Sequence, residues 1–481
     1  MTRRVHSLKS ASAVRVLQAR QPGARALLAI AAAVCVSFAI CPGVRADATP
    51  GGPELPQSLT LEDALRVFRA HGLDVLIAEA AVKTAEGGVT VAGAIQNPVV
   101  TANGGYSFTW AYTYASGKDC SAYGALCVPW NYGFGINDSA MVADWLSGKR
   151  DLRLKAARNA LAAAKMSRAD AVRTLTFQVK SAYLQVAQAQ LAYAFAKEVD
   201  TTEGTTLRKF QDRFRRGAIN EGDLQRIEIQ KLEADQVVDA AQSAQRQARA
   251  ALAFLLGVRG DAPDFDVDTK ALDYSEPSGL RDVTPVHLLG IAFDHRPDLV
   301  SAGYLRASAE AQIELVKRQK FPDVTLGMNY VWGGFNGWSV DNSIVAPMLS
   351  FSLSAPLPIF YQLQGEQHQA EAQLDTNQLQ HAKTTAQVVS DVATALATLE
   401  ASRKLVQRME GPRREAGGLL ESARGSFDIA AAQYDNGAAN LTDYLDALRT
   451  YIATKNEYLG DLTNYWTAVY QLEAAVGKDL R

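Results

Sequence analysis

The sequence has few of the residues and motifs from which enzyme sites are built. No Walker loop, GxSxG or HExxH motif occurs. The histidines beyond residue 50 are scattered and never spaced as metal-ligand pairs on one helical face: His71, His287, His295, His368 and His381. After residue 46, no apolar run approaches the ~18 to 20 residues of a membrane-spanning helix. We therefore expect no enzyme, no cofactor, no metal site and no helical membrane span in the mature chain.

Acidic residues are absent from the first 46 positions, which hold seven basic residues. An apolar run from Ala26 to Cys41 follows, and Val44-Arg45-Ala46 offers a cleavage site, so we expect a signal peptide at 1–46. Acylation of Cys41 is the alternative, although Ile40 stands where a small residue is wanted. Cleavage would leave 42 basic and 51 acidic residues, a net charge of −9, which argues against nucleic acid as a partner.

Cysteine is also scarce, with four in the chain. Two would leave with the signal peptide, and the remaining pair is Cys120 and Cys127. In an exported chain the compartment is oxidising, so we expect a disulfide between them, the alternative being two free loop thiols.

What the sequence does contain is a duplication. FRRGAINEGDL, from Phe214 to Leu224, returns as YDNGAANLTDY from Tyr434 to Tyr444, an offset of 220. At an offset of 224, residues 60–106 match residues 284–330 at scattered positions, including His71 with His295. The expected organisation is an extended segment at 47–59, a first repeat at 60–257, a linker at 258–283, a second repeat at 284–477 and a tail at 478–481.

Each repeat predicts the same elements in the same order. Hydrophobic periodicity and capping residues predict helices at 61–96, 148–214 and 221–256, and at 285–320, 365–434 and 441–476. Strict apolar and polar alternation predicts strands at 100–110, 130–136, 324–332 and 349–357. A helix of 67 residues would extend ~100 Å, about the length of two 36-residue helices in series.

The four strands each have one apolar face, which poses a problem of closure. The smallest membrane barrels use about eight strands, and an open edge in lipid costs several kcal/mol per unpaired backbone group. The chain must therefore oligomerise if its strands lie in a bilayer. A soluble sheet with one buried face would show the same alternation, but aromatic residues near the expected strand ends favour the membrane.

This plan resembles the TolC-like outer-membrane efflux protein family over nearly all of the mature chain. The motifs that carry the resemblance are HRPDLVSA at His295, KFPDVTLGMNY at Lys320, PLPIFYQLQGEQHQAEA at Pro356 and the two Gly-Ala hairpins. The first three motifs most resemble the outer-membrane subunits of heavy-metal (CzcC-like) RND efflux systems. The resemblance implies a mainly α fold with a membrane β-barrel: a homotrimer whose twelve-stranded outer-membrane barrel continues as a long periplasmic α-helical barrel.

The quoted stretch has a local explanation as a helical hairpin. Gly217 and Gly437 suit a left-handed helix end, and Asn220 and Asn440 suit N-caps. The acidic residues three positions after these asparagines favour the positive end of the next helix.

The resemblance adds functional roles to these hairpins. It implies that Gly217, Ala218, Gly437 and Ala438 contact a periplasmic adaptor. It also implies a pore constriction, and the candidate gate residues are Asp443, Asp446, Tyr434 and Asp223. Ala439 departs from the family, whose best-known members carry a basic gating residue there. Ordinary helix capping is the competing explanation for the aspartates.

We therefore expect a passive exit duct for heavy-metal cations in the outer membrane, working with a periplasmic adaptor and an inner-membrane pump of the RND type. The same duct serving organic compounds or type I protein secretion is an open alternative. So is a trimeric structural or adhesive surface protein, which would not need two hairpins suited to an adaptor.

Overall fold

The computed structural model of the protein describes residues 52–53, 55–106, 130–138, 141–260, 264–280, 284–333, 347–411, 417–436 and 438–480. The chain divides into two compact units, Met1–Gly51 and Gly52–Arg481, and every helix and strand below belongs to the second. The expected signal peptide, the expected disulfide between Cys120 and Cys127, and Gly437 lie outside the described residues. Among the described residues, no helix is both long enough and apolar enough to cross a bilayer.

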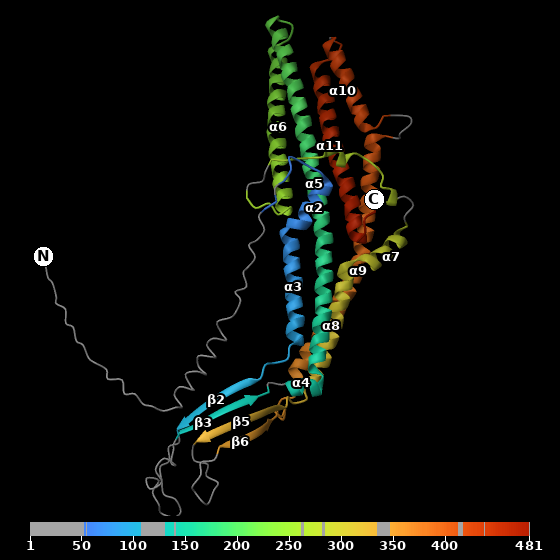
Figure 1. The fold of residues 1–481 in the computed structure, drawn as a ribbon. Helices are drawn as coiled ribbons and strands as arrows, with labels where there is room; N and C mark the ends of the chain where they lie inside the picture. Colours follow the sequence, from blue (N-terminus) through green and yellow to red (C-terminus); the bar gives the residue numbers. More distant parts are fainter. Residues whose placement is uncertain are drawn as a thin grey trace, which may run out of the picture. The chain divides into compact units, whose positions relative to one another are not determined.

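The two repeats share one plan, a pair of helices, two strands and a long helical hairpin, although their elements are not identical (Figure 1). β1 (Ser58–Leu59) precedes the first repeat, which comprises α2 (Leu61–His71), α3 (Leu73–Gly93), β2 (Val99–Tyr106), β3 (Trp130–Asn137), α4 (Met141–Ser147), α5 (Lys149–Arg215) and α6 (Glu221–Leu255). The second comprises α7 (Pro285–His295), α8 (Pro297–Gln319), β5 (Thr325–Gly333), β6 (Met348–Ser354), α9 (Gln364–Glu410), α10 (Leu419–Asp435) and α11 (Leu441–Val476). Between the repeats lie β4 (Asp266–Val267) and two short 3₁₀ helices, η2 (Thr269–Leu272) and η3 (Ser278–Leu280).

The first helix of each repeat is broken in two, so the prediction of continuous helices at 61–96 and 285–320 is wrong. The break falls at Gly72 and at Arg296, whose ψ angles of 120° and 115° leave the helical region. Arg296 precedes Pro297, and proline disfavours the helical conformation of the residue before it. Both breaks fall at the same place in the repeat, so the kink belongs to the shared plan.

The prediction of one helix from 365 to 434 is also wrong. α9 ends at Glu410 and α10 begins at Leu419. Gly411 has a φ of +79°, and Pro412 follows it. Proline lacks the backbone N–H that would continue a helix, and Gly417-Gly418 adds a second breaker before α10 begins. The second repeat is thus interrupted where the first has one continuous helix.

Helix α5 is the longest element, with 67 residues, and would extend ~100 Å. It packs against α3 and α8 and also against α6 and α11. The end of α6 meets the break between α2 and α3, because Gly257 lies against the carbonyl of His71. The shorter helices α3 and α6 therefore follow one another along α5, as the lengths predict (Figure 1).

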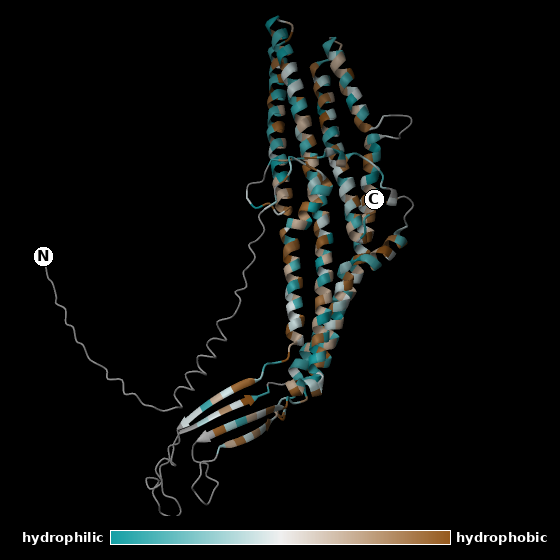
Figure 2. Ribbon diagram, in the orientation of Figure 1, coloured by the Kyte–Doolittle hydropathy of each residue, from teal (hydrophilic) through white to brown (hydrophobic). Residues whose placement is uncertain are grey.

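Strands β2, β3, β5 and β6 form one antiparallel sheet in that order. The register brings residues of one kind together on each face, and Figure 2 shows hydrophobic and hydrophilic residues alternating along the strands. Val100, Ile136, Met328 and Phe351 are aligned across one face, and Thr101, Gly135, Asn329 and Ser350 across the other. A Cβ at Gly135 would overlap the Asn329 side chain, so this glycine makes room for a polar neighbour.

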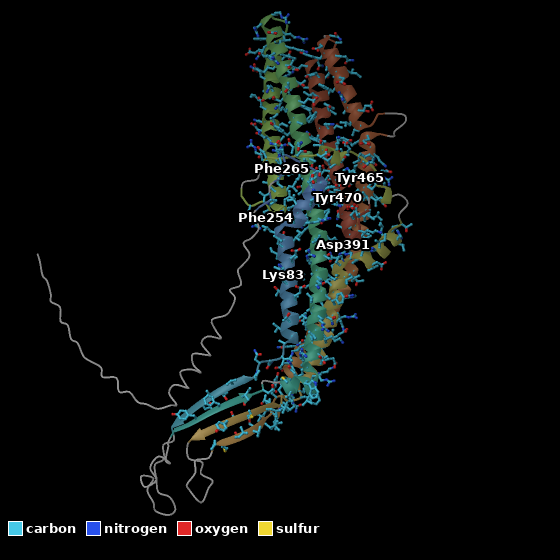
Figure 3. All side chains as sticks on the ribbon, in the orientation of Figure 1. Lys83, Phe254, Phe265, Asp391, Tyr465 and Tyr470 are labelled. Carbon is cyan, nitrogen blue, oxygen red and sulfur yellow. The ribbon has the colours of Figure 1, made fainter. Side chains whose placement is uncertain are left out.

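The main core lies where α2, α5, α7, α9 and α11 meet. Tyr465 and Tyr470 of α11 are buried there, and so is Phe265 of the segment between the repeats (Figure 3). β1 and β4 pair in parallel beside this core, and the Tyr183 hydroxyl donates to the Leu59 carbonyl at 2.9 Å. Phe265, Val267 and Leu272, within the segment 258–283 expected as a linker, are therefore part of the core.

Candidate functional site

The turn between α5 and α6 is a compact helical hairpin. Gly217 has a φ of +69°, and the Ala218 N–H donates to the Arg213 carbonyl at 2.9 Å, which closes the end of α5. The Asn220 Oδ1 then accepts the Asp223 N–H at 2.8 Å, as an N-cap does. Gly217 and Ala218 are both exposed.

The second hairpin, between α10 and α11, repeats these contacts. The Ala438 N–H donates to the Gln433 carbonyl at 2.8 Å, and the Asn440 Oδ1 accepts the Asp443 N–H at 2.9 Å. Ala438 is exposed, as Ala218 is. Each hairpin therefore presents a small exposed alanine, and an asparagine caps the helix that follows it.

The candidate gate aspartates lie on the exposed face of α11. Tyr444, Leu445 and Leu448 are buried on the opposite face, whereas Asp443 and Asp446 are exposed. Neither carboxylate has an ion-pair partner among the described residues, although the Asp443 backbone N–H does serve the cap. These two side chains are the free acidic groups of the second hairpin tip.

Asp223, the equivalent of Asp443 in the first repeat, has a different setting. It is half-buried, and one carboxylate oxygen lies 3.8 Å from Arg226 one turn later on α6. The structure thus separates the aspartates predicted together: Asp443 and Asp446 are exposed and unpaired, while Asp223 has a cationic neighbour.

Tyr434 belongs to an aromatic cluster that joins the two hairpins. Its ring stacks on Phe210 of α5, with centroids 5.4 Å apart and planes 2° from parallel. It also contacts the Tyr444 ring at 5.7 Å, and the Arg213 guanidinium lies over its face. Burial raises the pKa of Tyr434, with Arg213 opposing the rise. Tyr434 therefore holds α10 against α5 through its contacts with Phe210 and Arg213.

Ionic contacts also cross between the hairpins. Asp435 of α10 lies 3.6 Å from Lys209 and 3.5 Å from Arg213, both on α5. On α11, the Arg449 guanidinium donates to the Gln230 Oε1 at 3.3 Å and lies 3.7 Å from Glu233, both on α6. These contacts link the second hairpin to the first at two places, through α5 and through α6.

Glu203 is a site residue that the sequence reasoning missed. It is fully buried on α5, and its Oε1 accepts from the Tyr444 hydroxyl at 3.5 Å. Its Oε2 has no partner among the described residues. Burial raises the pKa of Glu203, while the Tyr444 hydroxyl and the Lys231 ammonium lower it. Glu203 lies on the apolar stripe of α5, between Ala196 and Phe210. An acidic residue on such a stripe is the sequence signal that could have identified it.

The sheet presents its apolar face to the outside of the chain. Side chains on that face are exposed in all four strands: Val100, Phe134, Ile136, Leu326, Met328, Tyr330, Leu349, Phe351 and Leu353. Phe351, for example, is 77% exposed. A soluble sheet with one buried face would cover these residues, so the structure excludes that alternative for this chain on its own.

Comparison with known proteins agrees with this architecture. The family model of the outer membrane efflux protein matches residues 65–258 and 288–478, one match for each repeat. The chain belongs to the outer membrane efflux protein family. It is an efflux channel subunit of the outer membrane with a large periplasmic helical portion, and it is not an enzyme.

Sequence identity to the individual relatives is low. The chain is 23% identical to the cobalt-zinc-cadmium resistance protein CzcC of Cupriavidus metallidurans, over 69% of this chain and 75% of CzcC. It is 26% identical to the toluene efflux pump outer membrane protein TtgF of Pseudomonas putida, over 47% of this chain and 45% of TtgF. The crystal structure of CusC is similar, with a TM-score of 0.67 and 19% identity, covering 87% of this chain and 92% of CusC. The fold of this chain is therefore that of an outer-membrane channel with a β-barrel and an α-helical barrel.

Proposed function

We propose that the protein is the trimeric exit duct of a tripartite efflux system and that it conducts heavy-metal cations passively to the cell exterior. The observation that supports the trimer is the sheet, in which β2 and β6 are edge strands and one face is apolar and exposed. Three copies supply twelve strands, enough to pair every edge in lipid.

The helices α6 and α10 also leave apolar side chains exposed. α6 packs on α5 and leaves a row of apolar side chains exposed: Ile229, Leu232, Val237 and Phe254. On α10, Leu419 and Ile429 are exposed in the same way. A neighbouring copy that places its α10 beside this α6 would bury both rows, so the same rotation can close the sheet and the helices.

The hairpin tips are the proposed contacts for the periplasmic adaptor. Gly217, Ala218, Gly437 and Ala438 are small, and small residues let a partner helix approach closely. Catalytic groups are not part of this role, so the energy for transport comes from the inner-membrane pump, which we propose is of the RND type. The likeness to CzcC supports both the pump class and the cargo.

The gate is proposed at Asp443 and Asp446, with Tyr434 and Asp223 beside them. In a trimer, six carboxylates from Asp443 and Asp446 would converge near the axis, where they repel one another and attract cations. Their exposure and their lack of ion pairs in the described part of the chain support this role over ordinary capping, which here falls to Asn440.

Conductance in planar bilayers tests the gate. We expect Asp443→Ala with Asp446→Ala to raise single-channel conductance and to weaken cation selectivity. Asp428→Ala is the matched control, because this exposed carboxylate lies on α10 near the hairpin and pairs with Arg424. The proposed gate is rejected if the double variant leaves the conductance unchanged, or if Asp428→Ala changes the conductance equally.

Cargo is tested in a deletion strain exposed to cobalt, zinc, cadmium and toluene. We expect lower resistance to the cations, restored by the gene. Loss of resistance to toluene alone would favour the alternative suggested by the likeness to TtgF. Loss of secretion of a protein, or a defect in adhesion, in the deletion strain with unchanged resistance would favour the remaining alternatives.

A further inference from the structure

The exposed side of α11 carries an acidic stripe that extends beyond the proposed gate. Exposed residues recur along this helix at alternating intervals of three and four positions: Asp443, Asp446, Thr450, Ala453 and Glu457. This spacing keeps the five side chains on one face of a supercoiled helix. The stripe contains three carboxylates and no basic residue. The face that carries the gate aspartates therefore continues as far as Glu457.

A second carboxylate, that of Asp461, lies one helical turn beyond Glu457. Residues four positions apart are neighbours on the surface of a helix, with their Cβ atoms about 5–6 Å apart. Glu457 is exposed, whereas Asp461 is only 8% exposed and flanks the stripe. Two like charges at this spacing destabilise a helix. The pair is therefore unfavourable for the chain by itself.

The Asp461 carboxylate also lacks a partner. Its Oδ2 is buried and has no hydrogen-bond donor among the described residues. Burial raises the pKa of Asp461, and the Glu457 carboxylate raises it further, with no cationic group in the described part of the chain opposing the rise. A buried oxygen left without a donor is unfavourable, most of all when the group carries a charge. Asp461 is thus a nearly buried ligand group with nothing bound to it.

The basic residues in this part of α11 are engaged elsewhere. Arg449 reaches Gln230 and Glu233 on α6, at 3.3 and 3.7 Å. The Lys455 Nζ lies over the Tyr458 ring, 5.6 Å from its centroid. The described part of the chain therefore leaves the carboxylate pair without a balancing cation.

Two carboxylates one helical turn apart offer oxygen ligands to a divalent cation. Hard divalent cations are bound through carboxylate oxygens, and Zn²⁺ accepts them as well. A monovalent ion would balance one charge of the pair and leave the other. Among the described residues no third histidine, cysteine or carboxylate joins the two, so water would complete the coordination. Conduction requires binding weak enough for the ion to leave, which two protein ligands satisfy better than a full set.

We propose that Glu457 and Asp461 form a divalent-cation site inside the duct, a second station for the cargo beyond the gate at Asp443 and Asp446. The inference rests on the proposed function, because the stripe faces the duct only if the gate aspartates do. Glu457 lies 14 residues after Asp443, which places the site ~20 Å further along α11. The exposed Glu457 receives the cation from the water of the duct, and the nearly buried Asp461 holds it.

Binding of Mn²⁺ to the purified trimer in detergent tests the site. Mn²⁺ suits oxygen ligands, and its free concentration is read from its electron paramagnetic resonance signal. The parent for all measurements is the full chain with Asp443→Ala and Asp446→Ala, so that the gate carboxylates do not contribute. Asp461→Asn and Glu457→Gln each remove a charge and keep the side-chain shape. Asp239→Asn is the matched control, because it removes one negative charge from an exposed position on α6.

We expect each chain of the parent to bind one Mn²⁺ ion, which Co²⁺ displaces. Asp461→Asn and Glu457→Gln should each weaken binding by roughly tenfold or more, since the loss of a residue that only supports a metal ligand already has an effect of that size. Glu457 is exposed, so its variant tests the site without disturbing buried packing. Unchanged affinity in Glu457→Gln, or an equal loss in Asp239→Asn, would overturn the site.

Failure of the site and failure of the proposed function give different results. Absence of Mn²⁺ binding, in a protein whose deletion still lowers resistance to cations, would overturn the site and leave the exit duct in place. Mn²⁺ binding that depends on Glu457 and Asp461, with unchanged cation resistance in the deletion strain, would support the site and reject heavy-metal cations as the cargo.

Discussion

The buried pair of Lys180 on α5 and Glu473 on α11 leads to a prediction opposite to the usual one for a broken ion pair. The Lys180 Nζ lies 2.6 Å from the Glu473 Oε2, and the side chains are 13% and 6% exposed. The Glu473 Oε1 has no hydrogen-bond donor among the described residues. We expect Glu473→Gln to stabilise the protein at neutral pH.

The magnitude follows from the pKa. Burial raises the pKa of Glu473 from 4.5 to about 6, against the opposing attraction of Lys180, and the Asp479 carboxylate adds repulsion. Because the folded-state pKa is the higher one, this group's contribution to stability is fully present below pH 4.5 and is lost as the pH rises through about 6. The loss is ~2 kcal/mol at ~1.4 kcal/mol per pH unit. Glutamine resembles the protonated acid, so the variant should keep this ~2 kcal/mol at pH 7.

The assay is thermal unfolding of the trimer in detergent, followed by helical circular dichroism at pH 4.5 and pH 7 with one scan rate. A difference of ~2 kcal/mol corresponds to ~2–4 °C in a chain of this size. We expect Glu473→Gln to melt higher than the unmodified protein at pH 7 and at the same temperature at pH 4.5. Lys180→Met is the matched control: it leaves the buried carboxylate without a cation and should lower the midpoint at pH 7, with recovery in acid.

A lower midpoint for Glu473→Gln at pH 7 would refute the reasoning. It would mean that the attraction between the Lys180 and Glu473 charges outweighs the cost of burying the carboxylate.

Three further predictions concern the hairpins and the helix ends. Gly257→Ala should cost ~2–3 kcal/mol, because φ is +83° and the new Cβ would overlap the His71 carbonyl; the equivalent Gly477→Ala, whose Cβ would lie 3.2 Å from a carbonyl oxygen, should cost less in the same thermal assay. Asn440→Ala should remove the N-cap of α11 and lower its stability by ~1 kcal/mol, which would appear as faster hydrogen exchange in its first turn. Unchanged exchange would show that this cap does not stabilise the helix. Glu203→Gln should slow hydrogen exchange around Tyr444 at neutral pH, since burial raises the pKa of this carboxyl and its charge is lost only in acid; faster exchange would show that the charge is stabilising.

Local pattern in the sequence predicted most of the secondary structure. The helix at 441–476 is observed with those limits, and the 67-residue α5 lies within one residue of its predicted range. These elements were predictable because periodicity and caps act within a few residues of each other. The residues that break the helix between α9 and α10, Gly411-Pro412 and Gly417-Gly418, are present in the sequence. The strong helical periodicity on both sides nevertheless led to the prediction of one continuous helix.

The sequence by itself determined the duplication, the two capped hairpins and the four amphipathic strands, because each depends on neighbouring residues. Tertiary structure alone decided which polar groups meet. Tyr444 reaches Glu203 across 241 positions, and Lys180 reaches Glu473 across 293. Only the tertiary structure shows that the apolar face of the sheet is uncovered and that the Trp145 and Phe360 side chains are exposed. It also shows that Asp223 has an ion-pair partner, whereas Asp443 has none among the described residues. The physical reason is that burial and pairing depend on distances between segments far apart in the chain, which no local pattern encodes.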